Sequence, residues 1–247
     1  MVYYIYHSAF AVELEKNILI FDFYKIPENK KMKENDFYER FVKREDKQVF
    51  VFSTHSHSDH FNPKILEWEK LNNRIIYILS DDIKISASPK NTYFTKEGDE
   101  LEISYKLGNN LENEKIKVYT FGSTDLGSSF YINIEDKNIF HAGDLHFWHW
   151  EDDTESEERA MKNAYLEQLN KIKTLPKIDI AFTAVDPRLG VNVYEGVELF
   201  WDLLKPKIII PMHFSDDYSA MKTFKEKFKA EKVKIIEIDD SMKEIME

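Results

Sequence analysis

Apolar positions along the chain follow two patterns, short runs that are typical of strands and stretches with helical spacing. Three short runs fill the first 24 residues, at 2–7, 10–15 and 17–23, and they predict a meander of strands. The later runs are mostly continuous, which is typical of strands buried on both faces. They lie at 47–55, 74–80, 115–123, 128–135, 137–144, 177–185, 205–214 and 232–239.

Stretches with helical spacing of apolar residues lie between many of these runs. This spacing predicts a short helix over 35–45, with Asn35 or Asp36 as its cap. Another begins at Pro63, because proline suits the first helical position. Strands dominate early and then alternate with helices, without a linker or repeat, so we predict one α/β domain over residues 1–247. The longer helices are predicted over 155–175, 194–204 and 216–231.

Composition and charge narrow the classes of function. The chain has 247 residues, of which 43% are hydrophobic and 14% aromatic, which is ample for a folded core. Its 34 Lys and Arg against 45 Asp and Glu give a net charge of −11, and no long basic run offsets it locally. We therefore expect a small-molecule substrate, and a nucleic-acid partner is disfavoured. The absence of cysteine excludes disulfides, thiolate metal sites and a cysteine nucleophile.

The N-terminal residues show no basic region followed by an apolar stretch, and no apolar run reaches the roughly 18 residues of a membrane span. The sequence therefore predicts a cytoplasmic protein without a membrane segment. Neither the composition nor the apolar pattern indicates an oligomeric state.

The segment STHSHSDHF, residues 53–61, holds three of the eight histidines and continues an apolar strand. Side chains two apart in an extended segment share a face, so His55 and His57 can converge on one cation. The turn that follows directs Asp59 and His60 toward another. Imidazole and carboxylate groups are natural ligands of zinc, manganese or iron, so two divalent cations are predicted. The alternative is a histidine-rich surface loop that binds no metal.

Two further apolar strands end in a potential ligand, Asp144 in KNIFHAGDLH and His213 in KIIIPMHF, and a rigid sheet can hold a site in this way. The spacing H-x-H-x-D-H over 55–60, followed by Asp144 and His213, resembles the ordered motifs of the metallo-β-lactamase fold hydrolases. Asp22, at the end of ILIFD, resembles the residue that supports the metal-binding loop in that superfamily. The resemblance spans residues 5–214 and is specific for the fold rather than for a substrate.

The resemblance implies a fold and a division of the ligands. The fold is a four-layer αββα sandwich, in which helices flank two mixed β-sheets and the metal site lies at one edge between the sheets. The ligands are divided between two cations. The first cation would be bound by His55 and His57, the second by Asp59, His60 and His213, and Asp144 would bridge the two.

One ligand of the superfamily pattern is absent. Relatives usually carry another histidine for the first cation, yet no histidine occurs from Phe61 to Phe140. Where it should stand, the chain reads FGSTDLGSSF, and Asp125 is the candidate replacement. A carboxylate there would favour manganese or iron over zinc. Alternatively, the segment around Asp125 only caps a turn, and the first metal site is incomplete.

Other polar residues near the motifs are candidate substrate contacts. His146 and His149 lie beyond a strand end and can face the cleft, or they can belong to a packed aromatic loop. Arg188, in AVDPRLG, can bind a phosphate or carboxylate of the substrate. The alternative for Arg188 is a turn that it forms with Asp186 through local hydrogen bonds.

Two histidines are interpreted as structural residues. His141 precedes Asp144 by three positions, so strand alternation places it on the opposite face. His7, in YHSAF, can approach the site from the first hairpin, but a lone histidine of this kind is more often a satisfied turn residue.

These motifs predict a metal-dependent hydrolase that acts on a small ester-type substrate, a phosphodiester or a lactone. Cations about 3.5–4 Å apart would activate a bridging water, which Asp59 would orient or deprotonate. Among relatives, the sequence looks closest to the stand-alone cytoplasmic group that includes sugar-phosphate lactonases. One alternative is a non-catalytic metal-binding or sensor module on the same fold. Another is a nuclease of the superfamily, which would need a basic groove or an RNA-binding arm that the sequence lacks.

Overall fold

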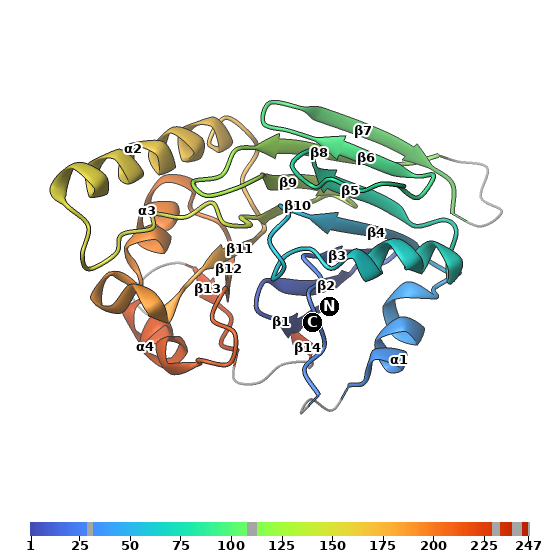
Figure 1. Cartoon of the computed structure of the whole chain (residues 1–247), viewed down its shortest axis with the longest axis horizontal. Coiled ribbons are helices and arrows are strands. Elements are labelled where there is room, and N and C mark those ends of the chain that lie inside the picture. Colours follow the sequence, from blue (N-terminus) through green and yellow to red (C-terminus); the bar gives the residue numbers. More distant parts are fainter. Residues whose placement is uncertain (29–31, 108–112, 229–232, 239–243, 247) are drawn as a thin grey trace.

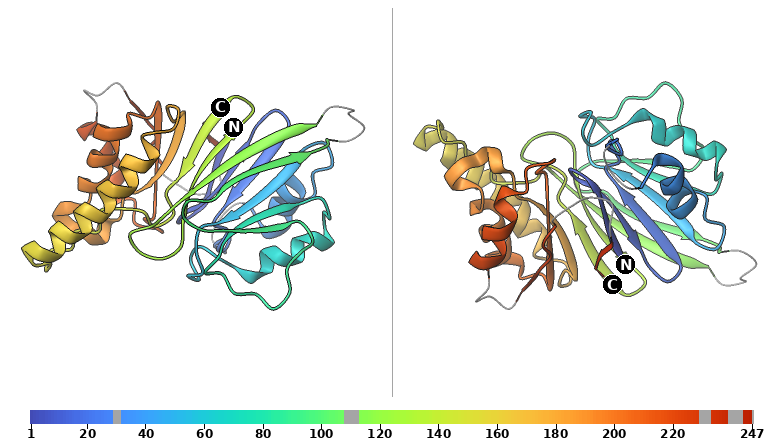
Figure 2. Two further views of the ribbon diagram at one scale, coloured as in Figure 1. Left: turned by 90° about the horizontal axis from the view of Figure 1, so that it is seen from above. Right: turned by 90° about the horizontal axis from the view of Figure 1, so that it is seen from below.

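Two β-sheets pack face to face, and helices cover their outer sides (Figure 1 and Figure 2). The computed structural model describes residues 1–28, 32–107, 113–228, 233–238 and 244–246. Within these residues each sheet has seven strands. The four-layer αββα sandwich implied by the resemblance is confirmed.

The first sheet begins with the predicted meander. Its strands are β1 (Val2–Tyr6), β2 (Ala9–Glu13), β3 (Asn17–Phe21), β4 (Gln48–Ser53), β5 (Ile76–Ser80), β6 (Thr92–Thr95) and β14 (Glu244–Met246). Their order is β14-β1-β2-β3-β4-β5-β6. The pairs from β14 to β3 are antiparallel, and those from β3 to β6 are parallel, so the sheet is mixed.

The second sheet is mixed in the same way. Its strands are β7 (Glu100–Tyr105), β8 (Glu114–Phe121), β9 (Ser129–Ile134), β10 (Lys137–His141), β11 (Ile180–Ala184), β12 (Ile208–Met212) and β13 (Lys234–Ile235). Their order is β13-β12-β11-β10-β9-β8-β7. The pairs from β7 to β10 are antiparallel and those from β10 to β13 are parallel.

Helices form the two outer layers (Figure 2). The first sheet is covered by α1 (Glu34–Phe37), which continues as the π-helical η1 (Tyr38–Val42), and by the 3-10 helix η2 (Pro63–Lys70). The second sheet is covered by α2 (Glu155–Ile172), α3 (Glu195–Leu204) and α4 (Ser219–Lys227), and the short 3-10 helix η3 (Pro187–Asn192) precedes α3. Among the described residues, no helix combines the length and apolar character that crossing a bilayer requires.

Strand β4 shows why so many runs are continuously apolar. Phe50 and Phe52 pack between the two sheets, whereas Val49 and Val51 pack toward the outer helices, where Trp68 is buried. Both faces of the strand are therefore removed from water. Burial of a large apolar side chain contributes roughly 1.5–3 kcal/mol, so this pattern stabilises two packed layers at once.

The predicted helices are observed, but one differs in type and another in its cap residue. Asn62 accepts a hydrogen bond from the Lys64 backbone N–H at 3.0 Å, and Pro63 occupies the first position as expected, although the helix is 3-10 rather than α. The predicted cap of the first helix is wrong. Lys33 occupies the cap position, and the Asp36 carboxylate accepts a hydrogen bond from its backbone N–H at 3.1 Å.

The last two predicted elements are shorter than expected in the part of the chain that the structure describes. The helix predicted over 216–231 is α4, and positions 229–231 lie outside the described residues. The strand predicted over 232–239 is the two-residue β13, and positions 232 and 239 also lie outside them.

The strand directions bring many loop residues to one edge. β2 is antiparallel to both β1 and β3, and β4 is parallel to β3, so β1, β3 and β4 run the same way. In the second sheet, β8, β10, β11 and β12 likewise share a direction. Residues that follow these strands therefore emerge at the carboxyl edge of their sheet, the usual position of a site in such folds.

Candidate metal centre

All seven predicted metal ligands meet at this edge, together with His7. They form two groups, and within each group one ligand atom per residue lies within 4.8 Å of the others. Each group takes ligands from the carboxyl ends of strands in both sheets. The first group is His55, His57, Asp125 and Asp144, and the second group is His7, Asp59, His60 and His213.

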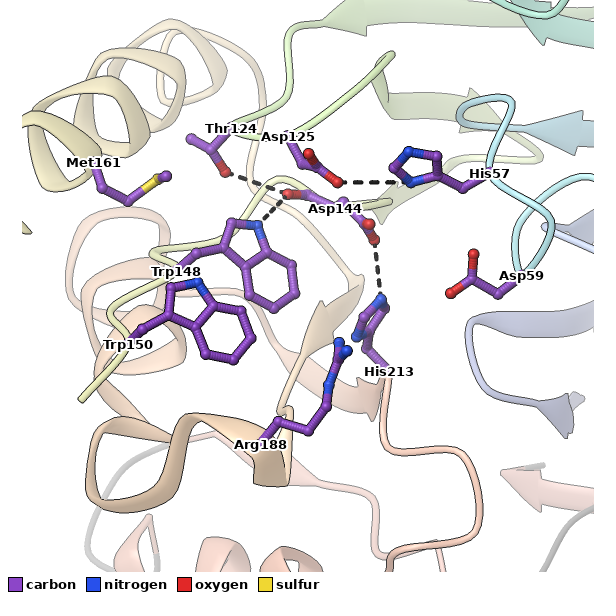
Figure 3. A pocket seen from close by; sticks show the side chains of 10 residues that line it. All are labelled: His57, Asp59, Thr124, Asp125, Asp144, Trp148, Trp150, Met161, Arg188 and His213. Carbon is purple, nitrogen blue, oxygen red and sulfur yellow. Dashed lines mark hydrogen bonds and ion pairs between the residues drawn. The ribbon is translucent and has the colours of Figure 1, made fainter. Parts of the chain in front are cut away.

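The first group contains the replacement carboxylate proposed from the sequence. His55 Nε2 lies 3.1 Å from His57 Nδ1. His57 Nδ1 lies 3.7 Å from Asp125 Oδ2 (Figure 3). The backbone N–H of Asp125 donates to Ser123 Oγ at 3.2 Å. Ser123 therefore supports the turn, and the carboxylate of Asp125 faces His57.

Asp144 lies between the two groups, where the superfamily pattern expects a bridging ligand. Its Oδ2 is 3.5 Å from His55 Nε2 in the first group. Its Oδ1 is 3.2 Å from His60 Nε2 and 3.3 Å from His213 Nε2 in the second group. One oxygen therefore faces each group, so this side chain can contribute a ligand atom to each of two cations.

Two buried carboxylates orient the histidines of the second group. Asp22 Oδ2 is 2.8 Å from His60 Nδ1, and Asp186 Oδ2 is 2.9 Å from His213 Nδ1. In both cases the contact is made by Nδ1, and the Nε2 atom of the ring is directed toward the centre. This arrangement fixes the ring and its tautomer in many metal sites, and the predicted supporting position of Asp22 agrees with it.

The donor atoms at the centre lack partners in a way that suits a cation. In the described part of the chain, the buried atoms His60 Nε2, His213 Nε2 and Asp144 Oδ1 form no hydrogen bond. Buried polar atoms are almost always paired, so three facing one another indicate a missing binding partner. Imidazole nitrogens and a carboxylate oxygen are donors for zinc, manganese or iron, so the residues present fit such ions.

Burial sets the protonation of these ligands. It lowers the pKa of His55 to about 3 and holds the pKa of His60 well below its ordinary value. Burial and then the surrounding aspartates raise the pKa of Asp144 well above its ordinary value. The imidazoles of His55 and His60 are thus neutral, as metal ligation requires, and a cation would relieve the repulsion around Asp144.

Two glycines allow the ligand loops to approach closely. Gly127 has φ +72, and a Cβ there would lie 2.3 Å from the Thr54 carbonyl oxygen and 2.4 Å from His55 Cβ. Gly143 has φ +54, and its Cβ would lie 2.7 Å from Thr54 Cβ. Only glycine permits both the left-handed backbone and these contacts.

An open cavity of about 340 Å³ lies over the two groups (Figure 3). Trp148 and Trp150 stack with ring centroids 6.1 Å apart and form one wall. Arg188 reaches the cavity beside Trp150 in Figure 3. The lining residues are His57, Asp59, Thr124, Asp125, Asp144, Trp148, Trp150, Met161, Arg188 and His213.

The three predicted substrate contacts differ in their positions. Arg188 lines the cavity and is also held by Asp186, whose Oδ1 accepts hydrogen bonds from Arg188 N at 2.9 Å and Nε at 3.0 Å. His146 is fully buried beside Gly196 and is not among the described residues that line the cavity. His149 is not among them either, and its Nδ1 pairs with Glu195 Oε2 at 2.8 Å.

The two remaining histidines differ in their relation to the ligand groups. His141 is buried, its Nε2 is 3.0 Å from the Ser8 carbonyl oxygen, and its ring stacks on Phe21, as the structural interpretation expects. His7 belongs to the second ligand group, so it approaches the site, which was the less favoured of the two alternatives that the sequence left open. The signal that could have placed it is that β1 runs in the same direction as β4, so His7 and His55 leave the sheet at one edge.

Known proteins resemble the chain over most of its length. A UPF0173 metal-dependent hydrolase of Nanoarchaeum equitans is 27% identical over 220 residues, which cover 86% of this chain and 82% of the relative. No protein-family model matches the chain.

Two solved structures share the architecture. Igni18, a novel metallo hydrolase from the hyperthermophilic archaeon Ignicoccus hospitalis, matches with a TM-score of 0.66 and 18% identity over 100% of this chain and 97% of that one. YhfI from Bacillus subtilis, a metallo-β-lactamase fold protein, matches with a TM-score of 0.59 and 9% identity over 98% and 96%. These similarities show that the chain has the metallo-β-lactamase fold, and the order of its motifs resembles that of the hydrolases with this fold.

Proposed function

We propose that the protein is a metal-dependent hydrolase that cleaves a small ester-type substrate with a metal-activated water. The observation that carries the proposal is the pair of ligand groups that share Asp144 beneath an open cavity. The similarity to a metal-dependent hydrolase of Nanoarchaeum equitans supports it.

Each ligand group would hold one divalent cation, with zinc, manganese and iron as candidates. His55, His57 and Asp125 would bind the first cation, and Asp144 would contribute one oxygen to each. When bound, such cations lower the pKa of a bound water and polarise the oxygen of the ester.

Asp59 is our candidate for the residue that handles the proton of the attacking water. Its side chain is 42% exposed and lines the cavity, so it is open to both water and substrate. The nearby His7 ring, whose Nε2 is 3.3 Å from Asp59 Oδ2, holds the pKa of Asp59 below its ordinary value despite partial burial. Asp59 is therefore a carboxylate near neutral pH, and a carboxylate can orient a water and accept its proton.

The cavity wall indicates what the substrate carries besides its ester. Arg188 lies with its guanidinium carbon 5.8 Å from the Trp150 ring centroid, where it can pair with an anionic group. A second hollow of about 390 Å³ continues along α2 and shares Trp148, Trp150 and Met161 with the cavity. We therefore infer an anionic substrate with an apolar or aromatic arm. An aryl phosphodiester meets both requirements, as does a lactone with an acidic group and an apolar part.

The test is hydrolysis before and after metal removal. The purified protein would be stripped with a chelator, reloaded with zinc or manganese, and assayed on phosphodiesters, lactones and thioesters. We expect activity only after reloading. Asp144→Ala and His60→Ala should lose both metal and activity, whereas His149→Gln, which lies outside both ligand groups and the cavity lining, should keep them.

The outcomes separate the alternative functions. Tight metal binding without hydrolysis of any substrate in the panel would favour a sensor or binding module. Cleavage of RNA in preference to every small substrate would favour a nuclease. Unchanged metal content in both Asp144→Ala and His60→Ala would contradict the metal centre itself.

A further inference from the structure

We propose that His7 is a ligand of the second cation and that it makes the second group the tighter of two unequal metal sites, filled before the first group. The site would be a three-histidine, one-aspartate site that also borders the shared Asp144. This inference extends the proposed metal centre, and it does not require that hydrolysis takes place.

The His7 ring points at the other ligands of the second group. The residue is 6% exposed, and its Nε2 is buried and without a hydrogen bond in the described residues. That atom lies 3.3 Å from Asp59 Oδ2. The ring centroid of His7 is 4.1 Å from that of His213 and 5.6 Å from that of His60. A cation placed among these atoms would satisfy all of them.

The ring of His7 is held in the manner of the other two histidines of the group. Its Nδ1 is 3.0 Å from Ser215 Oγ, as the Nδ1 atoms of His60 and His213 face carboxylates. In each case an oxygen fixes one nitrogen and leaves Nε2 for the centre. The fold therefore orients three imidazoles so that each can provide one Nε2 ligand atom.

The backbone around His7 is also fixed, and it is strained. Its N–H donates to the Tyr4 hydroxyl at 2.9 Å, and its carbonyl oxygen accepts from the His213 backbone N–H at 3.2 Å. His7 has φ 58, His213 has φ 71 and Ser215 has φ 48, all in the left-handed region. Such conformations have a cost and concentrate at binding sites, where surrounding contacts enforce them.

The two groups differ in preorganisation. In the second group, His60 is fully buried, His213 is 5% exposed, and Asp59 is the one side chain that is largely exposed, at 42%. In the first group, the side chains of His57 and Asp125 are 48% and 49% exposed, and they are 3.7 Å apart. The first group must therefore order two solvated side chains when it binds a cation, which costs conformational entropy.

The groups also differ in donor type. Apart from the shared Asp144, the second group offers three imidazoles and one carboxylate, and the first offers two imidazoles and one carboxylate. Nitrogen-rich sites suit zinc, whereas oxygen-rich sites suit harder ions such as manganese. The chain thus lacks the usual extra histidine near the first cation and gains one, His7, near the second. We expect one zinc to bind tightly and a further ion to bind more weakly.

Calorimetric titration of the metal-free protein with zinc tests the order of filling. We expect two steps for the wild type. His7→Asn, whose amide side chain tolerates a positive φ, should weaken the tight step by at least the roughly 10- to 100-fold that follows loss of an outer hydrogen-bond partner. The matched variant Asp125→Asn should weaken only the second step. Unfolding curves of both metal-free variants would establish that each is folded.

Two results would overturn the inference. One is an unaltered tight step in folded His7→Asn, and the other is loss of the tight step in Asp125→Asn. If His7→Asn does not fold, X-ray absorption of the wild type with one equivalent of zinc decides the question. Three imidazole ligands are expected, and two or fewer would exclude His7.

Discussion

At the scale of single residues, the centre depends on side chains that never touch a substrate. Asp22 is fully buried, and its carboxylate accepts hydrogen bonds from Thr54 N at 2.8 Å and Thr54 Oγ1 at 2.7 Å. The same carboxylate holds His60 Nδ1. One side chain therefore fixes both the start of the metal-binding loop and the orientation of a ligand.

We expect Asp22→Asn to weaken metal binding through the tautomer of His60. An amide N–H in place of the carboxylate oxygen makes Nδ1 an acceptor, so the proton moves to Nε2, the nitrogen needed by the cation. Zinc affinity should fall roughly 10- to 100-fold. Asp179→Asn is the control, because Asp179 accepts a backbone hydrogen bond from Asn138 far from the centre. Equal affinities of wild type and Asp22→Asn in the same titration would show that Asp22 does not set the tautomer.

A second prediction for a single residue concerns Gly127 and the stability of the fold. Gly127→Ala adds a Cβ that collides with the Thr54 carbonyl oxygen and His55 Cβ, in addition to the cost of a left-handed backbone. Gly98→Ala is a matched control, since Gly98 has φ +90 but nothing within 4 Å of the added atom. Thermal unfolding should show a loss of about 1–2 kcal/mol for Gly98→Ala and about 2–5 kcal/mol for Gly127→Ala. Similar losses in the two variants would mean that the loop moves aside at no cost.

At the scale of elements, the apolar runs predicted most of the strands, but they missed β6 and β7. β6 was not predicted, because Tyr93 and Phe94 lie exposed in a short strand between polar residues. β7 was not predicted either, since ELEISY alternates with charged positions and buries only Ile103 and Tyr105. Both strands are set by pairing with a neighbour, which a local pattern does not reveal.

Ion pairs also join elements, and one predicts a pH dependence. Glu13, at the end of β2, is 7% exposed and lies 2.9 Å from Arg44 Nη1 and 3.0 Å from Lys47 Nζ, both in the segment before β4. Burial acts to raise the pKa of Glu13, but the hydrogen bonds from Lys47 and Arg44 outweigh it and lower the pKa below its ordinary 4.5. The pair therefore stabilises the protein above pH 4.5, and this stability is lost as pH falls through the lowered value.

We expect Glu13→Gln to reduce the free energy of unfolding by roughly 1–2 kcal/mol at pH 7, because two partly buried cations lose their partner. The difference from wild type should shrink as the pH falls below 4.5. Denaturant titrations at several pH values measure it. Glu102→Gln, which removes an exposed pair with Lys115, should cause no measurable change. A pH-independent loss in Glu13→Gln would point to packing rather than charge.

At the scale of the whole molecule, the sequence predicted the architecture better than the site. The order of the motifs led to the αββα fold and to seven ligands that the structure does bring together. It did not decide whether His7 joins the site or is only a turn residue, or whether His146 faces the cavity or is buried in a packed loop. Those facts depend on which loops of one sheet contact which loops of the other. The packing of the two sheets determines these contacts, and no single segment of the sequence does.

The division of ligands between the sheets leads to a last prediction. His60 follows β4 in the first sheet and His213 follows β12 in the second, so a cation bound to both links the sheets. A cation that binds only the folded state should therefore stabilise both sheets against unfolding. The free energy of unfolding should rise by about 2.7 kcal/mol when zinc is at 100 times its dissociation constant. Hydrogen exchange with and without zinc should show slower exchange in β4 and in β12 alike, and His60→Ala should show neither effect. Protection confined to residues 53–61 would mean that the loop binds metal by itself and that the two-sheet centre does not form.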